Sequence, residues 1–338
     1  MTSAPVAQGL ARLWYGDCAL AALLQPLALL FGLGVRLRRT AYRRGWLASG
    51  HPGVPVIVVG NLTAGGAGKT PLVVWLVERL HAAGMRPGIV SRGYGGAPQA
   101  EPLHVGAATG PDTAGDEPVL LARRTGVPVM VCVDRLKAAR AVVREGADVI
   151  VADDGLQHYA LRRDVEILVV DGARRWGNGR LLPAGPLREP PARAAEVDAV
   201  VVNGGEARAG EAGFTLRLGE AVSLATGERR PLAAFAGQRV HALAGIGNPA
   251  RFHDALAALG MQVAPVPVAD HGRTDLAGLR REAPWPILMT EKDAVKYAGC
   301  RDPQAWYLPV DVQMFPGSAE WLMTRIASRL KPGGAIRG

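Results

Sequence analysis

The feature that most constrains this chain is a buried strand that runs through a glycine-rich loop into a helix. Residues 54–60 read VPVIVVG, residues 60–71 read GNLTAGGAGKTP, and a helix-length segment follows at 70–84. The loop ends in Gly-Lys-Thr, which is the end of a P-loop, in the strand–loop–helix context that this motif requires. The segment therefore predicts an α/β fold with a phosphate-binding loop after its first strand.

The loop itself supplies the groups that bind phosphate. Consecutive backbone N–H groups in a glycine-rich turn, and the helix N-terminus behind them, attract phosphate oxygens. Lys69 would reach the β- and γ-phosphates of ATP, and the Thr70 hydroxyl would ligate Mg²⁺. The strict motif has glycine at position 63, where this chain has threonine. A glycine-rich turn with an incidental lysine is the alternative, which the flanking strand and helix disfavour. The expected nucleotide-binding residues are Thr63, Ala64, Gly65, Gly66, Ala67, Gly68, Lys69 and Thr70.

Short apolar runs alternate with helix-length segments along the rest of the chain. Continuous valine and isoleucine runs between helices are typical of a parallel sheet that is covered on both faces. The 338 residues suffice for about two domains. The expected strands of the first domain are 54–60, 88–91, 127–133, 148–152, 165–170 and 198–202.

A second alternating pattern follows, with its last strand expected at 306–312 and its last helix at 317–330. We predict a P-loop NTPase-like domain with a mostly parallel sheet and a smaller second α/β domain that completes a cleft. The predicted ranges are 1–50 for an N-terminal segment, 51–205 for the P-loop domain, 206–238 for a linker or antiparallel ribbon that forms a hinge, and 239–338 for the smaller domain.

Two acidic residues follow the strand at 148–152. Asp153 and Asp154 begin the sequence DDGLQH. Acids at the carboxyl end of a parallel strand face the nucleotide site, and one of them would hold Mg²⁺ directly or through water. A polar turn at the end of the strand is the alternative, and the neighbouring P-loop favours the metal site.

Three further side chains are candidates for the chemistry. Asp116 in GDEP opens a helix, so it could be the N-cap or a base that takes a proton from an acceptor hydroxyl. His271 follows a strand of the second domain; it could be a loop residue, or could orient a carboxylate when the cleft closes. Arg188 in PAGPLREP lies on the same predicted edge, where a guanidinium suits a phosphate of the nucleotide or the acceptor.

The N-terminal segment combines an apolar run with a basic flank. Residues 18–35 carry no charge, and five arginines follow between 36 and 44. A buried helix is one possibility. We favour a helix that lies in the cytoplasmic leaflet, with residues 18–46 at the membrane surface, over one that spans it. A cleaved signal peptide would carry its basic residues before the apolar run.

The composition excludes several classes of protein. Disorder is excluded because 49% of the residues are apolar and can form a core. The net charge of +9 could indicate nucleic-acid binding, but its clustering beside an apolar segment argues for a membrane surface. Three separated cysteines give neither a disulfide framework nor zinc spacing. We predict no nucleic-acid partner, and we expect a monomer.

Taken together, the motifs resemble those of the tetraacyldisaccharide 4'-kinase family, the lipid A 4'-kinases of Gram-negative bacteria. The resemblance extends from the apolar segment to about residue 312 and rests on several motifs in one order. These are GNLTAGGAGKTP, SRGYGG (91–96), GDEP (115–118), DDGLQH (153–158), LLPAGPLREP (181–190), DH (270–271) and TEKDAVK (290–296).

The resemblance implies an activity and a role for individual residues. ATP would phosphorylate the 4'-hydroxyl of a tetraacylated glucosamine disaccharide 1-phosphate at the cytoplasmic face of the inner membrane. Asp116 would be the catalytic base, assisted by His271, and Arg188 would stabilise phosphate. Asp153 and Asp154, with Glu117, would serve Mg²⁺. The alternative is a P-loop ATPase or switch that acts on a protein partner, because such proteins share the GGAGKT loop.

Overall fold

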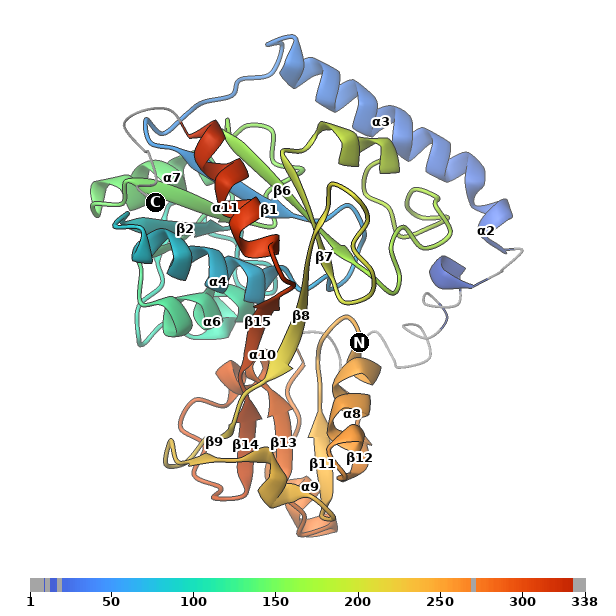
Figure 1. The fold of residues 1–338 in the computed structure, drawn as a ribbon, viewed down its shortest axis with the longest axis vertical. Helices are drawn as coiled ribbons and strands as arrows, with labels where there is room; N and C mark the ends of the chain where they lie inside the picture. Colours follow the sequence, from blue (N-terminus) through green and yellow to red (C-terminus); the bar gives the residue numbers. More distant parts are fainter. Residues whose placement is uncertain (1–8, 10–12, 17–19, 269–271, 331–338) are drawn as a thin grey trace.

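The computed structural model describes residues 9, 13–16, 20–268 and 272–330 and arranges them in two lobes, each built on its own sheet (Figure 1). The larger sheet has the strand order β15-β8-β7-β6-β1-β5-β2-β4-β3. It is mostly parallel, as predicted, with antiparallel pairing of β15 to β8 and of β3 to β4. Its strands are β1 (Val56–Gly60), β2 (Pro87–Ser91), β3 (Leu103–His104), β4 (Val129–Val131), β5 (Val149–Asp153), β6 (Val165–Asp171), β7 (Ala199–Asn203), β8 (Ala212–Leu218) and β15 (Val310–Met314).

Helices cover both faces of the larger sheet because successive strand residues point to opposite faces. Ile57 and Val59 of β1 join the buried cluster under α4, α6 and α11, whereas Val56 and Val58 join the cluster under α7. The helices of this lobe are α4 (Lys69–Ala82), α5 (Pro111–Ala114), α6 (Asp116–Thr125), α7 (Arg135–Arg144) and α11 (Ser318–Arg329).

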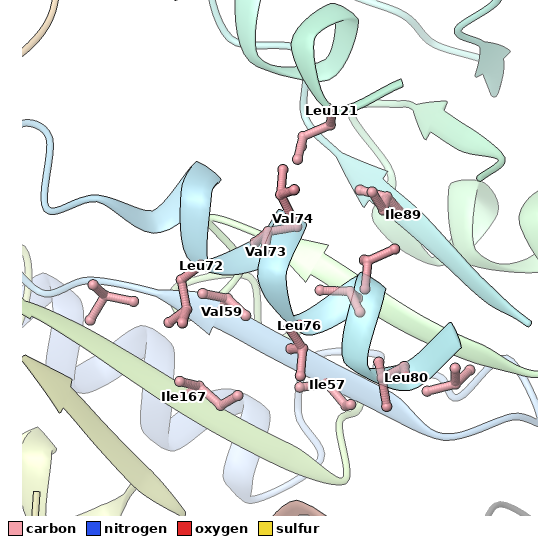
Figure 2. Close-up of a cluster of buried hydrophobic side chains, with 14 of the residues drawn as sticks. Ile57, Val59, Leu72, Val73, Val74, Leu76, Leu80, Ile89, Leu121 and Ile167 are labelled. Carbon is pink, nitrogen blue, oxygen red and sulfur yellow. The ribbon is translucent and has the colours of Figure 1, made fainter. Parts of the chain in front are cut away.

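The helix behind the P-loop is fixed by its apolar face. Leu72, Leu76 and Leu80 follow each other at four-residue spacing and are fully buried. Figure 2 shows them directed at Ile57 and Val59 of β1. Burial of each leucine stabilises the fold by about 1.5–3 kcal/mol. The start of α4, where the phosphate groups are expected, is therefore held rigidly on the sheet.

The smaller lobe has a six-stranded sheet in the order β10-β9-β14-β13-β11-β12. Strands β14, β13, β11 and β12 pair in parallel, β9 and β10 pair antiparallel, and two buried clusters lie on the faces of the sheet. Its elements are β9 (Ala221–Ser223), β10 (Arg229–Arg230), β11 (Arg239–Leu243), α8 (Pro249–Ala258), β12 (Gln262–Val266), α9 (Leu276–Glu282), β13 (Ile287–Thr290), α10 (Glu291–Ala294) and β14 (Ala305–Leu308).

The strands within the predicted ranges 206–238 and 239–338 do not divide between the two sheets as those ranges imply. β8, which falls in the predicted linker, belongs to the larger sheet, and only the later β9 and β10 join the smaller one within the described residues. The predicted strand 306–312 is divided by Pro309 into β14 and β15, and β15 returns to pair with β8. The smaller lobe is thus an insertion between two adjacent strands. Local sequence does not determine which distant strand is the partner.

The N-terminal helices are α2 (Leu20–Leu23) and α3 (Gln25–Arg43), and α3 runs along the outside of the larger lobe (Figure 1). Ala28 and Gly32 face the protein, and Arg39 pairs with Glu196. All five of its leucines are exposed to solvent; Leu29 and Leu30 each expose about two thirds of their surface, 64% and 65%. In the described part of the chain, no helix combines the length and the apolarity needed to cross a bilayer.

Candidate active site

The register of the larger sheet brings the P-loop and the acidic strand end together. β5 pairs with β1 so that Asp153 lies opposite Val59, one residue before β1 ends. The P-loop follows β1, and DDGLQH overlaps the end of β5, so both motifs occupy the same sheet edge. The prediction that these motifs are neighbours is confirmed.

The shape of the loop depends on two buried asparagines. The Asn61 side-chain amide donates to the carbonyls of Thr63 and Gly65, at 2.8 and 3.2 Å. The Asn203 amide donates to the Ala67 carbonyl at 3.1 Å. Gly68 has φ +87°, and a Cβ atom there would lie 2.3 Å from Asn203 Nδ2. Glycine is therefore required at this position by both the backbone conformation and the close approach.

The predicted lysine, one aspartate and the predicted arginine form one charged group. Lys69 Nζ lies 3.0 Å from Asn61 Oδ1 and 3.3 Å from Asp154 Oδ1. Arg188 Nη1 lies 3.1 and 3.0 Å from the two Asp154 oxygens. Burial disfavours ionisation of Asp154, but the charges of Lys69 and Arg188 outweigh it and lower the pKa of this carboxyl. Both cations are therefore held in place at the mouth of the loop.

Asp153 has a different environment from its neighbour. Its side chain is buried, and neither carboxylate oxygen has a hydrogen-bond partner among the described residues. Burial, followed by the negative charge of Glu117, raises the pKa of Asp153 to about 7. A buried, unsatisfied carboxylate beside a P-loop has the donor chemistry that suits Mg²⁺.

The expected metal ligands do not by themselves complete a site. The structure as described contains no cluster of three or more His, Cys, Asp or Glu side chains arranged to hold a metal ion. Glu117 accepts a hydrogen bond from Lys292 at 3.2 Å, and Asp154 is paired with cations. The orphaned oxygens of Asp153 nevertheless fit Mg²⁺, because this ion usually keeps several water ligands and binds substrate phosphates.

The candidate base lies where the lobes meet. Asp116 is buried at the start of α6, and Lys296 Nζ from the smaller lobe lies 3.4 Å from Asp116 Oδ2. Gly115 is the N-cap residue of α6 and Asp116 is the first residue of the helix, so the N-cap alternative for Asp116 is wrong. His271 lies outside the described residues, and its predicted role remains a prediction.

A cavity of about 1110 Å³ connects these groups and is lined by both lobes and by α3. One wall carries the P-loop with Glu117 and Arg188, and α8 of the smaller lobe contributes Arg251 and Phe252. Helix α3 contributes an apolar and basic group made of Phe31, Val35 and Arg38. The cavity is large enough for a nucleotide together with part of a second substrate.

The structure also identifies contributors that the sequence analysis did not assign. Asn61 directly follows the P-loop strand, and its position was a usable signal. Asn203 ends β7, a distant strand, so no local signal connects it with the loop. Lys296 and Asp293 belong to the TEKDAVK motif, which carried no assigned role.

A central parallel sheet, a glycine-rich loop between β1 and α4, and an acidic strand end beside the loop define a P-loop nucleoside triphosphate-binding protein. The comparisons with known proteins specify the class further. A family model described as tetraacyldisaccharide-1-P 4'-kinase matches residues 20–329. The chain belongs to this family, and the kinase activity expected from the sequence is confirmed.

Curated relatives and one solved structure match nearly the whole chain. Tetraacyldisaccharide 4'-kinase of Stenotrophomonas maltophilia is 50% identical over 330 residues, covering 94% of this chain and 96% of the relative. The enzyme of the same name from Aeromonas hydrophila is 49% identical, covering 97% and 98%. A crystal structure of "apo" form LpxK from Aquifex aeolicus in complex with ATP matches with a TM-score of 0.76 and 30% identity, covering 92% of this chain and 100% of that one.

Proposed function

We propose that this protein transfers the γ-phosphoryl group of ATP to the 4'-hydroxyl of a tetraacylated glucosamine disaccharide 1-phosphate at a membrane surface. The observation that carries the proposal is the single cavity that joins the P-loop, the cation group around Asp154 and the apolar, basic face of α3. Such a cavity suits a nucleotide at one end and an amphiphile at the other. A P-loop switch acting on a protein partner does not require this joint cavity.

The nucleotide end is built for charge neutralisation. Backbone N–H groups of the loop and the Lys69 ammonium would bind the phosphates, while Arg188 would neutralise charge on the transferred group. Thr70, Asp153 and Glu117 would hold Mg²⁺, with Asp154 acting through Lys69 and Arg188. When bound, Mg²⁺ supplies electrostatic stabilisation of phosphate oxygens. The protein's contribution is mainly positioning, since phosphoryl transfer requires little covalent chemistry from it.

The transfer step assigns Asp116 as the base. The acceptor oxygen forms a bond to the γ-phosphorus while the bond from that phosphorus to the bridging oxygen breaks. The electron pair of the broken bond leaves with ADP, and the hydroxyl proton passes to the Asp116 carboxylate. His271 would assist from the smaller lobe. The position of Asp116 where the two lobes meet supports its assignment as the base.

The acceptor's acyl chains would remain in the membrane while its sugars enter the cavity. The uncovered leucines of α3 provide an apolar surface, and the arginines that follow match anionic headgroups. Phe31 and Arg38 of the same helix line the cavity. One helix would therefore connect the cytoplasmic face of the inner membrane with the site of transfer.

A transfer assay tests the proposal. Radiolabelled ATP is incubated with tetraacyl disaccharide 1-phosphate in detergent, using wild-type protein, Lys69→Ala, and Lys137→Ala as a matched control on the exposed face of α7. Label should enter the lipid with wild type and Lys137→Ala and be lost with Lys69→Ala. Full-rate ATP hydrolysis without acceptor, and no labelled lipid, would instead favour the ATPase or switch.

A further inference from the structure

The TEKDAVK segment of the smaller lobe contacts the helix that begins with the proposed base. Glu291 Oε2 lies 2.8 Å from Arg124 Nη1, and Lys292 Nζ lies 3.2 Å from Glu117 Oε1. Lys296 Nζ lies 3.4 Å from Asp116 Oδ2. Three successive contacts therefore connect this segment with both ends of α6.

The last of these contacts is the most buried. The side chains of Lys296 and Asp116 expose 2% and 5% of their surface. A charged pair so far from water is costly unless each partner has further hydrogen bonds. Lys296 has one, because its ammonium also lies 2.8 Å from Asp293 Oδ1.

Asp293 organises this group and is itself fully buried. Its Oδ2 accepts the Thr290 hydroxyl at 2.6 Å and the backbone N–H of Gly245 at 2.8 Å. A Cβ at Gly245 would lie 2.6 Å from Asp293 Oδ1, so the close approach requires glycine. The Asp293 carboxylate thus binds the Lys296 ammonium through one oxygen and the backbone of Gly245 through the other.

The chain at 245 leads directly to the P-loop. Two residues later, a Cβ at Gly247 would lie 2.4 Å from the backbone nitrogen of Gly66, so the two loops touch through their backbones. Asp293 therefore connects the smaller lobe with the nucleotide loop and with the base at the same time.

We propose that Lys296, fixed by Asp293, is a positioning residue that orients the Asp116 carboxylate toward the acceptor hydroxyl. The inference rests on the proposed function, in which Asp116 takes the proton. The larger lobe supplies the base, and the smaller lobe supplies the cation that makes it effective. The Lys296 ammonium lies 2.8 Å from Asp293 and 3.4 Å from Asp116, so the contact with Asp293 fixes the direction from which it meets the Asp116 carboxylate.

If the contact between Lys296 and Asp116 only held the two lobes together, replacement of Lys296 would have a different effect on the kinetics. Arg124 of the larger lobe already pairs with Glu291 of the smaller lobe across the same boundary. Loss of an ion pair that only joins the lobes would weaken substrate binding and lower the stability of the protein. Loss of an orienting cation would lower turnover through Asp116 and leave substrate affinity unchanged.

The test is a double-mutant cycle on the full chain in detergent with ATP and tetraacyl disaccharide 1-phosphate. It compares Lys296→Met, Lys296→Arg, Asp116→Asn and the double variant Lys296→Met/Asp116→Asn, with Lys137→Met as the control. We expect Lys296→Met to lower kcat about 100-fold and to change KM for either substrate by less than about twofold. Lys296→Arg should recover part of the loss, because it keeps the charge.

The double variant decides whether Lys296 acts through Asp116. Its kcat should equal that of Asp116→Asn alone within about threefold, since a positioning residue has nothing left to position. Additive losses, a parallel change in KM, or an unchanged kcat in Lys296→Met would overturn the proposal. If Lys296→Met does not fold, Lys296→Gln/Asp293→Asn removes one charge of each sign and faces the same kcat and KM criteria. Wild type that labels no acceptor would overturn the proposed function itself, and this inference with it.

Discussion

Replacement of Asp153 by asparagine should stabilise the free protein while it disables the enzyme. Asp153 is buried, its carboxylate oxygens have no hydrogen-bond partner among the described residues, and its pKa is raised to about 7. Asparagine has nearly the same shape and no charge. The variant therefore removes the cost of a buried charge and little of the packing.

The magnitude follows from linkage between protonation and folding. Below the unfolded value of 3.8, the carboxyl is protonated in both states and the charge costs nothing. Between 3.8 and about 7, only the unfolded chain ionises readily, so the free energy of unfolding falls as the pH rises. Above about 7 the loss is complete and amounts to about 4 kcal/mol, at about 1.4 kcal/mol per pH unit. At pH 5 less than half of this loss in the free energy of unfolding is present.

The buried amide of asparagine offsets part of this gain. Because an unsatisfied amide costs about 1–3 kcal/mol, the net stabilisation at pH 8 should be about 1–3 kcal/mol. This corresponds to a rise in Tm of about 2–6 °C. At pH 5 the two proteins should melt within about 2 °C of each other.

The assay is thermal unfolding at pH 5 and pH 8 with a chelator and no nucleotide. Asp254→Asn, on an exposed position of α8, is the matched control and should change Tm little at either pH. Mg²⁺ with ATP should raise the Tm of wild type more than that of Asp153→Asn, because the variant lacks the proposed ligand. The reasoning is refuted if Asp153→Asn is less stable than wild type at pH 8, or if the difference in Tm is the same at both pH values.

Three further predictions concern the nucleotide, the core and the membrane. Lys69→Ala should weaken ATP binding by about tenfold or more, measured by titration with a fluorescent ATP analogue, because the loop loses its ammonium. Leu76→Ala should lower the free energy of unfolding by about 2–5 kcal/mol in denaturant titrations, because it opens a cavity between α4 and β1; a loss below 1 kcal/mol would contradict this packing. Leu29→Gln/Leu30→Gln should reduce sedimentation with vesicles of anionic phospholipid by about tenfold or more, whereas Leu259→Gln, an exposed leucine of the smaller lobe, should have no effect. Equal binding by both leucine variants would show that the membrane surface lies elsewhere.

Both lobes contribute to the candidate active site. The nucleotide loop and Asp116 belong to the larger lobe, and two lysines of TEKDAVK in the smaller lobe reach Glu117 and Asp116. β8 and β15, which pair with each other, both lead from the larger sheet into the smaller lobe. A paired connection of this kind limits relative movement of the lobes more than a single flexible linker would.

The local sequence pattern was sufficient to predict the elements that carry the nucleotide-binding part of the site. The continuous valine run of β1 and the Gly-Lys-Thr that follows predict a strand, a phosphate loop and a helix, because backbone geometry and phosphate chemistry act within a dozen residues. The acidic end of β5 was predictable for the same reason. The apolar and basic character of the N-terminal helix was predictable as well.

Tertiary structure decided everything that depends on distant pairing. The sequence by itself determined a P-loop α/β protein with Lys69, Asp153 and Asp154 at one sheet edge. It did not determine that β15 returns to β8, that Asn203 fixes the loop, or that Lys296 reaches Asp116 across 180 residues of chain. Those contacts form because folding brings strand ends and buried charges from separate segments to one place, where each charge needs a partner. A partner is chosen by proximity in space, which local sequence does not encode.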